Sequence, residues 1–403
     1  MRIPFSPPDI GQREIDAVVE TMKSSWITTG PKTQELSEKV AEYCHVPYAA
    51  CMNSATACHE MAMRLLGIGA GDEVIVPAYT YTASASVINH VGAVPVIVDT
   101  DPESFYISYE AVEKAITPRT KAIVPVDLGG VLCDYDRLRQ IAESKKSVFT
   151  PSNDLQRSIG RIAIVADGAH SFGAERTDGK RSGELADFTS FSFHAVKNLT
   201  TAEGGALSWR PIDGVDGKHI KKQLALLACH GQDRAFLPEG EKPFWEYDIV
   251  YTGYKHNMTD ILASIGLVQM SRIEEIAAKR RSIVKKYNDA LSSLEGVSIL
   301  NHLETRGSSC HLYLVRFPER DEKFRNEFMD RMLAKGVATN VHYKPLPLHT
   351  AYKNLGFNIS DYPNAYNMYK NEVTLPLYTL LTDEQVDYII EMFMEVYSEM
   401  RKK

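Results

Sequence analysis

Short, continuous runs of apolar residues recur along the first half of the chain, and helical patterns lie between them. The clearest runs are residues 94–98, 121–126 and 161–167. A run without alternation of polar and apolar residues is typical of a strand that is buried on both faces of a parallel sheet. Helical patterns at 109–116 and 135–142 separate the runs. Strands that alternate with helices indicate βαβ units, so we predict an α/β fold with a mostly parallel sheet flanked by helices.

A second stretch, residues 188–205, begins like a strand and ends in a Gly-Gly pair. The aromatic and hydroxyl side chains of its first half suit a pleated, half-buried surface, and the glycines free the backbone for a tight turn. Lys197 stands in the middle, next to Val196 and near Leu199. An amine among apolar neighbours loses hydration, which lowers its pKa and makes it a nucleophile that forms a Schiff base with an aldehyde. Because a lysine after a strand is also typical of solvated surface, the stretch alone leaves both interpretations open.

Asp167 ends the apolar run 161–167 and is followed by a glycine. In an open parallel sheet, ligands bind outside the carboxyl ends of the strands, so we expect Asp167 at a ligand site. Pyridoxal phosphate (PLP) enzymes need a carboxylate that keeps the pyridine nitrogen protonated, so that the ring accepts electrons. An aspartate that caps a turn or a helix fits the same pattern.

A polar turn at residues 53–56 joins a predicted strand at 48–52 to a predicted helix. The free N–H groups and the dipole at a helix N-terminus favour phosphate, so this turn is a candidate anion site. Ser54 or Thr56 also suits a simple helix cap.

Taken together, these motifs resemble the DegT/DnrJ/EryC1/StrS family of sugar aminotransferases, which are fold-type I PLP enzymes with a smaller α+β C-terminal domain. The resemblance covers nearly the whole chain and includes residues 26–32, 53–56, 77–81, 191–205 and 253–260. Within the family, the resemblance is greatest to the branch that aminates the 4-keto group of nucleotide sugars. UDP-4-amino-4-deoxy-L-arabinose aminotransferase is an example of that branch. The resemblance implies PLP as the cofactor, L-glutamate and 2-oxoglutarate as the donor pair, and a nucleotide keto-sugar as the acceptor. It also implies a place in cell-surface glycan or lipopolysaccharide biosynthesis.

The resemblance also implies roles for individual residues. Lys197 would hold PLP as a Schiff base and act as general base, and Asp167 would pair with the pyridinium nitrogen. The further cofactor-binding residues that it implies are Ala55, Thr56, Tyr81, His170, Ser192 and Lys255. The substrate-facing residues that it implies are Thr29, His194, His342 and Tyr343. In the family, the segment that contains Lys255 reaches the cofactor phosphate of the partner subunit, which implies a homodimer with shared active sites.

Three other functions remain open at this point. Dehydratases of the family replace the lysine with histidine, and Lys197 argues against that activity. The 3-keto-sugar branch tends to lack the pattern that His194, Lys197 and Glu203 form here. A PLP-bound regulator without catalysis is disfavoured by the intact lysine and its partner carboxylate. The chain departs from the family at Asp127, where close relatives often carry histidine, and in the polar segment 147–160, which we interpret as a surface loop without a catalytic role.

The length of 403 residues exceeds what one hydrophobic core usually supports, which predicts two domains. We place a large PLP-binding α/β domain at residues 1–260 and a small α+β domain at 261–403. The small domain would begin with one long helix at 261–287 and contain strands at 312–317 and 337–343.

Composition narrows the choice of partners and compartment. A net charge of −7 argues against a general nucleic-acid binder. The six cysteines form no CxxC pair, which is typical of a reducing compartment. No window has the apolar length of a signal peptide or a membrane span. We therefore expect a cytoplasmic enzyme that binds neither nucleic acid nor a membrane, and we expect no metal site.

Overall fold

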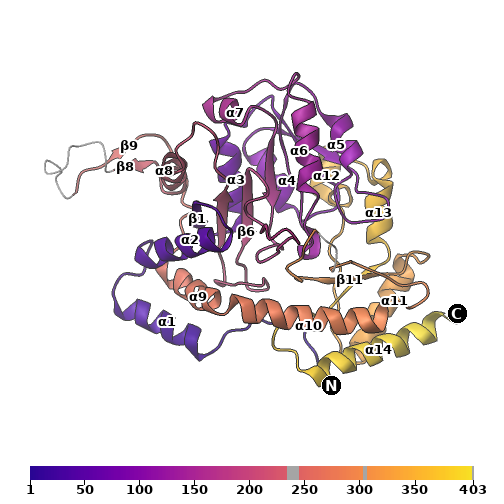
Figure 1. Ribbon diagram of the computed structural model, residues 1–403. Helices are drawn as coiled ribbons and strands as arrows, with labels where there is room; N and C mark the ends of the chain where they lie inside the picture. Colours follow the sequence, from indigo (N-terminus) through magenta and orange to yellow (C-terminus); the bar gives the residue numbers. More distant parts are fainter. Residues whose placement is uncertain (234–244, 303–305, 402–403) are drawn as a thin grey trace.

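A computed structural model describes residues 1–233, 245–302 and 306–401 of the chain. The strands of its large sheet are β1 (Tyr48–Met52), β2 (Glu73–Pro77), β3 (Val94–Val98), β4 (Thr120–Ile123), β5 (Ala163–Asp167), β6 (Phe188–Ser192) and β7 (Gly205–Trp209). Their order is β1-β7-β6-β5-β4-β2-β3 (Figure 1). β7 runs antiparallel to both of its neighbours, and the other pairings are parallel. This sheet confirms the predicted α/β fold.

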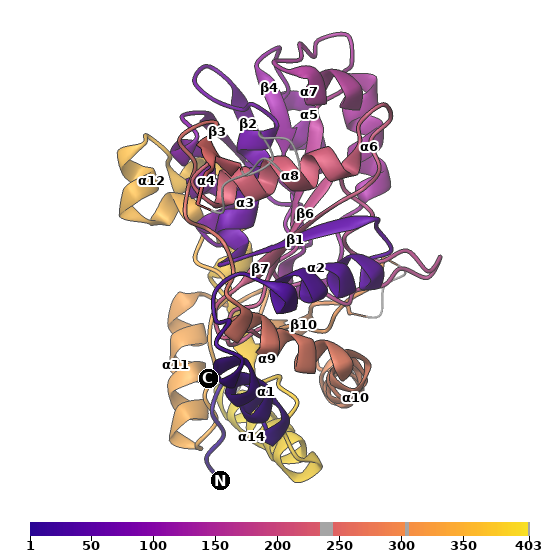
Figure 2. The ribbon, with the colours of Figure 1, turned by 90° about the vertical axis from the view of Figure 1, so that its left-hand side faces the viewer.

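Helices cover both faces of the sheet (Figures 1 and 2). They are α2 (Pro31–Tyr43), α3 (Ala55–Leu65), α4 (Ala83–His90), α5 (Tyr109–Ala115), α6 (Tyr135–Ser144), α8 (Gly217–Ala228) and α9 (Asp260–Ser271). Successive residues of a strand point to opposite faces. In β6, Phe188 packs in the apolar cluster that includes α3, whereas Phe191 packs in the cluster of α2 and α9. Ser190 and Ser192 therefore face α3.

The polar segment 147–160 contains a short helix, α7 (Asp154–Ile159), so it is more ordered than the loop that we predicted. The Oδ1 atom of Asn153 accepts the N–H of Gln156 and caps this helix, while Nδ2 of Asn153 donates to a carbonyl in the last turn of α3 at 3.1 Å. Nε2 of Gln156 donates to the next carbonyl, that of Leu66, at 2.6 Å. Two side-chain amides thus satisfy carbonyls at the C-terminal end of α3.

A smaller antiparallel sheet lies in the C-terminal half, in the order β10-β11-β12. It consists of β10 (Ser298–Ile299), β11 (Tyr313–Arg316) and β12 (Glu372–Leu375). The helices that share its core are α10 (Ile273–Leu291), α11 (Glu322–Ala334) and α14 (Asp383–Arg401). Two shorter helices, α12 (Thr350–Asn354) and α13 (Pro363–Tyr369), lie between α11 and β12 in the sequence. Ile3 joins this core and donates its N–H to the carbonyl of Gly336 at 2.8 Å. We keep the division into residues 1–260 and 261–403 as a proposal, in which the first residues of the chain pack on the second part.

The single helix predicted at 261–287 is wrong, because α9 and α10 are separate helices. The backbone leaves helical geometry at Arg272, which has φ −126° and ψ 17°. The guanidinium of Arg272 donates to Glu14 Oε1 at 3.0 Å and to Asp9 Oδ1 at 3.2 Å. Contacts with the N-terminal segment, distant in sequence, thus accompany the break.

The strand predicted at 337–343 is also wrong. Val337 and Asn340 each make only an isolated bridge, to Ile3 and Thr374 respectively. The third strand of the small sheet is β12, which is buried although it contains a glutamate and a threonine. These polar residues hid β12 from a search for apolar runs.

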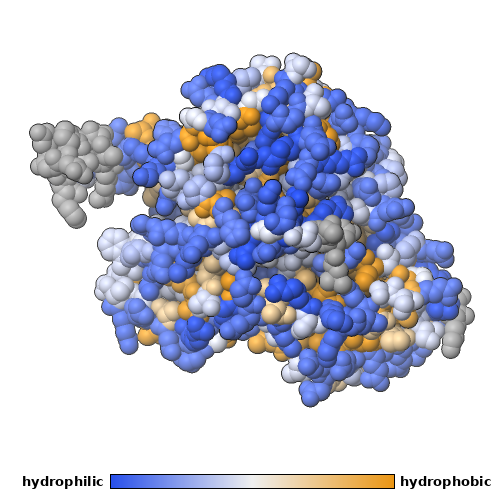
Figure 3. Space-filling view, in the orientation of Figure 1, coloured by the Kyte–Doolittle hydropathy of each residue, from blue (hydrophilic) through white to orange (hydrophobic). Residues whose placement is uncertain are grey.

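Two surface features stand out. A short hairpin of β8 (Gln232–Asp233) and β9 (Asp248–Ile249) projects from the body (Figure 1). Helix α1 (Gln12–Lys23) exposes apolar side chains, namely Ile15, Val19 and Met22. Apolar patches lie over α1 and α9 in Figure 3.

Within the described ranges, no helix has the length and apolar character to cross a membrane, and no cluster of three or more His, Cys, Asp or Glu side chains suits a metal ion.

Candidate active site

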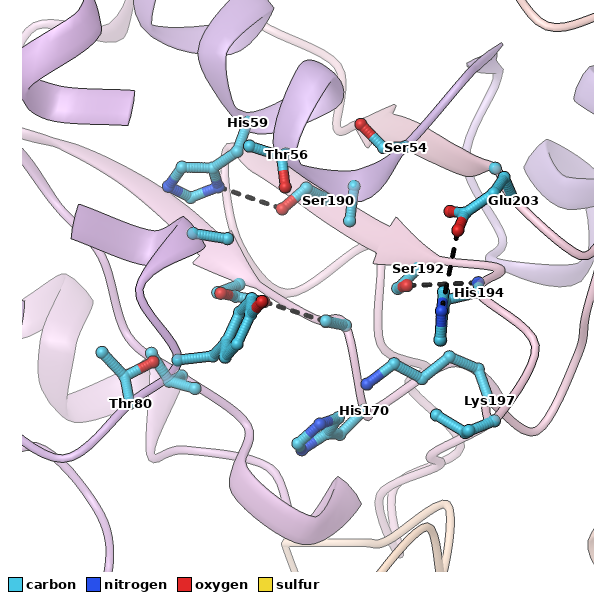
Figure 4. Close-up of a pocket in the computed structure, with 18 of the residues that line it drawn as sticks. Ser54, Thr56, His59, Thr80, His170, Ser190, Ser192, His194, Lys197 and Glu203 are labelled. Atoms are coloured by element: carbon cyan, nitrogen blue, oxygen red, sulfur yellow. Dashed lines mark hydrogen bonds and ion pairs between the residues drawn. The ribbon is translucent and has the colours of Figure 1, made fainter. Parts of the chain in front are cut away.

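A cavity of about 490 Å³ opens at the carboxyl ends of β5 and β6, beside the first turn of α3 (Figure 4). Most of the residues singled out in the sequence line it: Ala55, Thr56, Tyr81, Asp167, His170, Ser192, His194, Lys197 and Tyr343. Thr29, His342 and Lys255 are not among the lining residues. Side chains from positions 55 to 343 of the sequence therefore meet at one place.

Asp167 is the last residue of β5 and is held by two donors. Ser84 Oγ, from the first turn of α4, donates to Oδ2 of Asp167 at 2.5 Å, and the N–H of Ala169 donates to Oδ1 at 3.1 Å. The hydroxyl oxygens of Thr80 and Ser84 lie 2.7 Å apart. Because the Ser84 proton goes to the carboxylate, Thr80 is the donor in that pair. These donors fix the direction of the carboxylate and leave it lone pairs for a ligand.

The first turn of α3 forms an anion-binding side of the cavity. Ser54 caps this helix by accepting the N–H three residues on at 3.0 Å, while helix geometry leaves the N–H groups of Ala55 and Thr56 free for a ligand. The hydroxyls of Thr56 and Ser192 lie on the same side (Figure 4). β7 approaches so closely that a Cβ at Gly205 would lie 2.4 Å from the nitrogen of Ala55. Free N–H groups, hydroxyls and the helix dipole together suit a phosphate.

Lys197 lies in the loop after β6, and its amine points toward the side of the cavity on which His170 lies (Figure 4). The side chain is half-buried. Burial lowers the pKa of Lys197 to about 8, although the nearby Asp167 carboxylate acts in the opposite direction. A larger fraction of the amine is therefore neutral near pH 8 than in a solvated lysine, and the neutral form is the nucleophile.

His170 has a defined tautomer. Its Nδ1 accepts the N–H of Gly129 at 3.2 Å, so the ring proton is on Nε2, which donates to the hydroxyl of Tyr343 at 3.0 Å. Burial, and secondarily the positive charge of Lys197, hold the pKa of His170 well below its usual value, so the ring is neutral. The rings of Tyr343 and Tyr81 lie 5.7 Å apart and extend this aromatic wall. The hydroxyl proton of Tyr343 is thus left for another acceptor.

The predicted substrate residues differ in position. His194 and Glu203 are exposed at the cavity, with Nε2 and Oε1 3.7 Å apart. Tyr343 lines the cavity, and His342 packs against it at a ring-centroid distance of 4.9 Å. The structure thus places three of the four predicted substrate residues at or directly beside the cavity.

Thr29 and Lys255 lie elsewhere on the protomer. Thr29 Oγ1 donates to the carbonyl of Met258 at 2.5 Å, which joins the loop after α1 to the segment 253–260. Lys255 is exposed, and its Nζ lies 3.8 Å from Sγ of Cys229. Within one chain, neither residue touches the cavity.

His59 and Ser84 are among the residues that line or support the cavity and that were missed in the sequence. His59 is buried on α3; its Nδ1 lies 3.0 Å from Ser190 Oγ, while Nε2 is buried without a partner in the described part of the chain. Its position one helical turn after Thr56 is a pattern that could have revealed it. Ser84 gave no such pattern, because it comes from another helix and meets Asp167 only in the folded chain.

Asp127, the departure noted in the sequence, does not face the cavity. Its buried carboxylate accepts from the Cys133 N–H, the Tyr135 hydroxyl and Ser171 Oγ, at 2.9, 2.9 and 2.7 Å. Burial raises its pKa to about 6. Its side chain therefore organises the loop after β4 and does not contact a ligand in the cavity.

Comparisons with known proteins show which family the chain resembles. Residues 8–394 match the DegT/DnrJ/EryC1/StrS aminotransferase family. The spore coat polysaccharide biosynthesis protein SpsC of Bacillus subtilis is 33% identical and covers 98% of this chain and 97% of its own length. The PLP form of a putative sugar aminotransferase from Streptococcus pneumoniae is 49% identical with a TM-score of 0.95, over 99% of this chain and 100% of its own. Helicobacter pylori PseC, an aminotransferase involved in the biosynthesis of pseudoaminic acid, is 25% identical with a TM-score of 0.86, over 99% and 100%.

The chain belongs to the DegT/DnrJ/EryC1/StrS aminotransferase family. It is a PLP-dependent sugar aminotransferase with a fold-type I architecture. The family and cofactor expected from the sequence are thereby confirmed.

Proposed function

We propose that the protein transfers the amino group of L-glutamate to the 4-keto group of a nucleotide-linked sugar, for the biosynthesis of a cell-surface glycan such as lipopolysaccharide. L-Glutamate becomes 2-oxoglutarate while the keto carbon of the sugar gains the amine, so the two half-reactions balance. The observation that carries the proposal is one cavity that holds the amine of Lys197, the carboxylate of Asp167 and the first turn of α3.

The cavity residues fit PLP. The N–H groups of Ala55 and Thr56, with the hydroxyls of Thr56 and Ser192, would hold the phosphate. Asp167 would accept the N–H of the pyridine ring with the lone pairs that Ser84 and Ala169 leave free. The Tyr81 ring, 59% exposed at the cavity, and His170 would bracket the pyridine ring.

The chain's own groups divide the acid–base work. When bound, PLP supplies an electron sink that allows a proton to leave and re-enter at carbon. Nζ of Lys197 takes the proton from the α-carbon of the donor and, in the second half-reaction, delivers a proton to C4 of the sugar. Asp167 would hold the proton on the ring nitrogen of the bound cofactor. Neutral His170 donates from Nε2 to Tyr343, which leaves the Tyr343 hydroxyl as a donor to a substrate oxygen.

The nucleotide-sugar assignment rests on relatives and on the accessible side of the cavity. SpsC is named for polysaccharide biosynthesis and PseC for pseudoaminic acid biosynthesis. In this chain, His194 is exposed at the cavity and, with Tyr343, offers hydrogen bonds to sugar hydroxyls. The free state of the six cysteines also suits a reducing compartment, so we propose that the enzyme acts in the cytoplasm.

We also propose a homodimer whose active sites are shared. Lys255 is exposed and lies away from the cavity of its own chain, as expected of a residue that serves the partner. The apolar residues Ile15, Val19 and Met22 on α1, together with Trp26 and Ile27, are exposed in the protomer. Contiguous apolar surface of this kind commonly marks an interface.

A panel of UDP-, dTDP- and GDP-linked 4-keto and 3-keto sugars, assayed with L-glutamate and the holoenzyme, tests the assignment. We expect 2-oxoglutarate and an amino sugar from a 4-keto substrate, and none with Lys197→Ala. A preference for 3-keto sugars, or loss of water instead of amination, would replace the proposal with one of the alternative family activities. A visible PLP band that L-glutamate leaves unchanged would indicate a regulator without catalysis.

A further inference from the structure

Glu372, the first residue of β12, is a buried carboxyl group that no ion pair in the described part of the chain neutralises. Its side chain is 0% exposed. Arg316 and Arg325 lie near enough to act on its charge, but both guanidinium groups donate hydrogen bonds elsewhere, to Asn371 and to the Tyr369 carbonyl, each at 3.1 Å. An ionised carboxylate without a paired cation is costly in such surroundings.

The partners of Glu372 lie on the segment that leads to the active site. The N–H of Asn340 donates to the carbonyl of Thr374 at 3.1 Å, and the N–H of Thr374 donates back at 2.8 Å. This antiparallel bridge places His342 opposite Glu372. The His342 N–H donates to Oε2 of Glu372 at 2.9 Å, and its neighbour Tyr343 lines the catalytic cavity.

A chain of hydrogen bonds connects the carboxyl group to the imidazole ring. Oε1 of Glu372 lies 2.5 Å from Oγ1 of Thr374, and the same Oγ1 lies 2.9 Å from Nδ1 of His342. Thr374 has one hydroxyl proton to give. If Glu372 is neutral, its proton goes to Thr374, and Thr374 donates to Nδ1 of His342, so the ring proton is on Nε2. If Glu372 is ionised, Thr374 donates to it and accepts from Nδ1 of His342, so Nε2 is a bare acceptor.

We propose that Glu372 and Thr374 are positioning residues that decide which nitrogen of His342 carries the proton. His342 lies directly beside the cavity, against the lining residue Tyr343, and neutral Glu372 would give it an Nε2–H that donates to an oxygen of a substrate bound there. The role toward substrate rests on the proposed function, whereas the relay itself does not. His342 packs on Phe5 at 5.6 Å and on Tyr343 at 4.9 Å, so its ring is fixed between two aromatic side chains.

The charged and titratable groups around Glu372 and His342 favour the neutral form of both side chains. Burial raises the pKa of Glu372 to about 8, against its hydrogen bonds to Thr374 and His342 and the nearby arginines. Burial, with the positive charge of Lys197, lowers the pKa of His342 to about 3. The other titratable groups that face this pair are Tyr79 and Tyr343 toward Glu372, and His170 and His311 toward His342. A neutral His342 has two tautomers, and Thr374 is the group that selects between them.

Nitrogen NMR of the holoenzyme labelled with ¹⁵N-histidine reads the tautomer directly, with His342→Gln to assign the resonances. We expect wild type to carry the proton on Nε2 at about pH 6 and on Nδ1 at about pH 10, on either side of the Glu372 ionisation. Glu372→Gln should keep it on Nε2 throughout, because the amide donates to Thr374 at any pH. Thr374→Ser should behave as wild type, and Thr374→Val should lose the pH response.

Kinetics give a second readout. We expect kcat/KM for the keto-sugar to fall about tenfold in wild type as Glu372 ionises, the effect of one lost hydrogen bond, and Glu372→Gln to lack that step. An Nδ1–H tautomer in wild type at about pH 6, or the same tautomer change in Glu372→Gln, would overturn the relay. If the relay is found but every keto-sugar is refused, the proposed function fails and the relay stands. If Glu372→Gln does not fold, the Thr374→Ser and Thr374→Val pair decides the question.

Discussion

Ser84 Oγ lies 2.5 Å from Oδ2 of Asp167, so a hydroxyl from the start of α4 occupies one lone pair of the carboxylate at the end of β5. A second donor, the N–H of Ala169, occupies the other oxygen at 3.1 Å. With both oxygens held, the carboxylate has a fixed direction toward the cavity. Such a preorganised acceptor suits a ring N–H better than a freely rotating side chain does.

Asp167→Asn should weaken PLP binding and slow transamination by about two to four orders of magnitude. A neutral amide does not hold the ring nitrogen protonated, and loss of a buried charged partner costs about 3–5 kcal/mol. The visible spectrum of the bound cofactor and single-turnover rates with L-glutamate check this.

Ser84→Ala is the graded control for that change. It removes one donor but keeps the charge of Asp167, so we expect a loss of about 1.5–3 kcal/mol, roughly 10- to 150-fold in rate. If the Asp167→Asn enzyme has the spectrum and kinetics of wild type, the cofactor does not bind at this carboxylate.

Lys197→Ala should abolish transamination while the fold is kept, because Lys197 is both the nucleophile and the proton carrier. The base role alone accounts for about 10²–10⁴ in rate. Lys197→Arg should be no better, since a guanidinium stays protonated and is no nucleophile. Circular dichroism and thermal unfolding establish the fold, and release of 2-oxoglutarate measures the activity. Near-wild-type turnover in the alanine variant would reject the assignment.

Gln156→Ala should destabilise the protein by about 1–3 kcal/mol without changing the chemistry of the site. The change leaves the buried carbonyl of Leu66 without its donor, which lies 2.6 Å away in the wild type. Ser158→Ala, an exposed change on the same helix, is the matched control and should stay within about 0.5 kcal/mol. Urea unfolding measures both. Equal stability of the two variants would mean that α7 does not support the C-terminal end of α3.

Glu372→Gln should stabilise the protein at high pH relative to wild type. The folded-state pKa of Glu372, about 8, lies above its value in the unfolded chain. The contribution of Glu372 to the free energy of unfolding is therefore fully favourable below about pH 4.5. It is lost as pH rises to about 8, because only the unfolded state ionises in that window. The variant should gain on the order of 5 kcal/mol relative to wild type between those limits, at about 1.4 kcal/mol for each pKa unit. Denaturant unfolding of both proteins at matched pH measures the difference, and a pH-independent difference would contradict it.

The parallel part of the sheet was predictable from the sequence because several of its strands are continuous apolar runs, as in Val94–Val98 and in Ala163–Asp167 up to its final aspartate. The main cofactor-site candidates were predictable because they stand at strand ends or in the first turn of a helix. β12 was not, since its polar residues hide a buried strand. Ser84 was not, because no local pattern reports which helix will meet Asp167.

His342 shows the same limit of prediction from sequence, here for the protonation of a single side chain. The motif placed it near the substrate, but the tautomer of its ring depends on Thr374 and Glu372, which are thirty or more residues away in the chain and come opposite it only through the antiparallel bridge at Asn340. Long-range pairing of buried polar groups is therefore what the sequence alone left undetermined.

The last prediction concerns the dimer, in which Lys255 is proposed to serve the partner's cofactor phosphate. Residues 253–260 are anchored where they begin and end: the Tyr254 N–H donates to the Leu227 carbonyl at 2.7 Å, and Asp260 accepts the N–H of Gly30 at 2.9 Å. The loop that precedes this motif includes residues 234–244, which lie outside the described residues. A rigidly held, exposed lysine is suited to a phosphate that another chain presents, because it acts as a point charge.

Mixing a Lys197→Ala chain with a Lys255→Glu chain tests this arrangement. If sites are shared, each heterodimer has one site with both defects and one with neither, so activity should appear after subunit exchange, at up to half of the wild-type value per heterodimer. If Lys255 acts in its own chain's site, every site keeps one defect and no activity returns. Exchange is verified with differently tagged chains, and each variant alone is the baseline. A fully active Lys255→Glu homodimer would show that the position does not contact the phosphate, because a carboxylate beside that anion is repelled in either subunit.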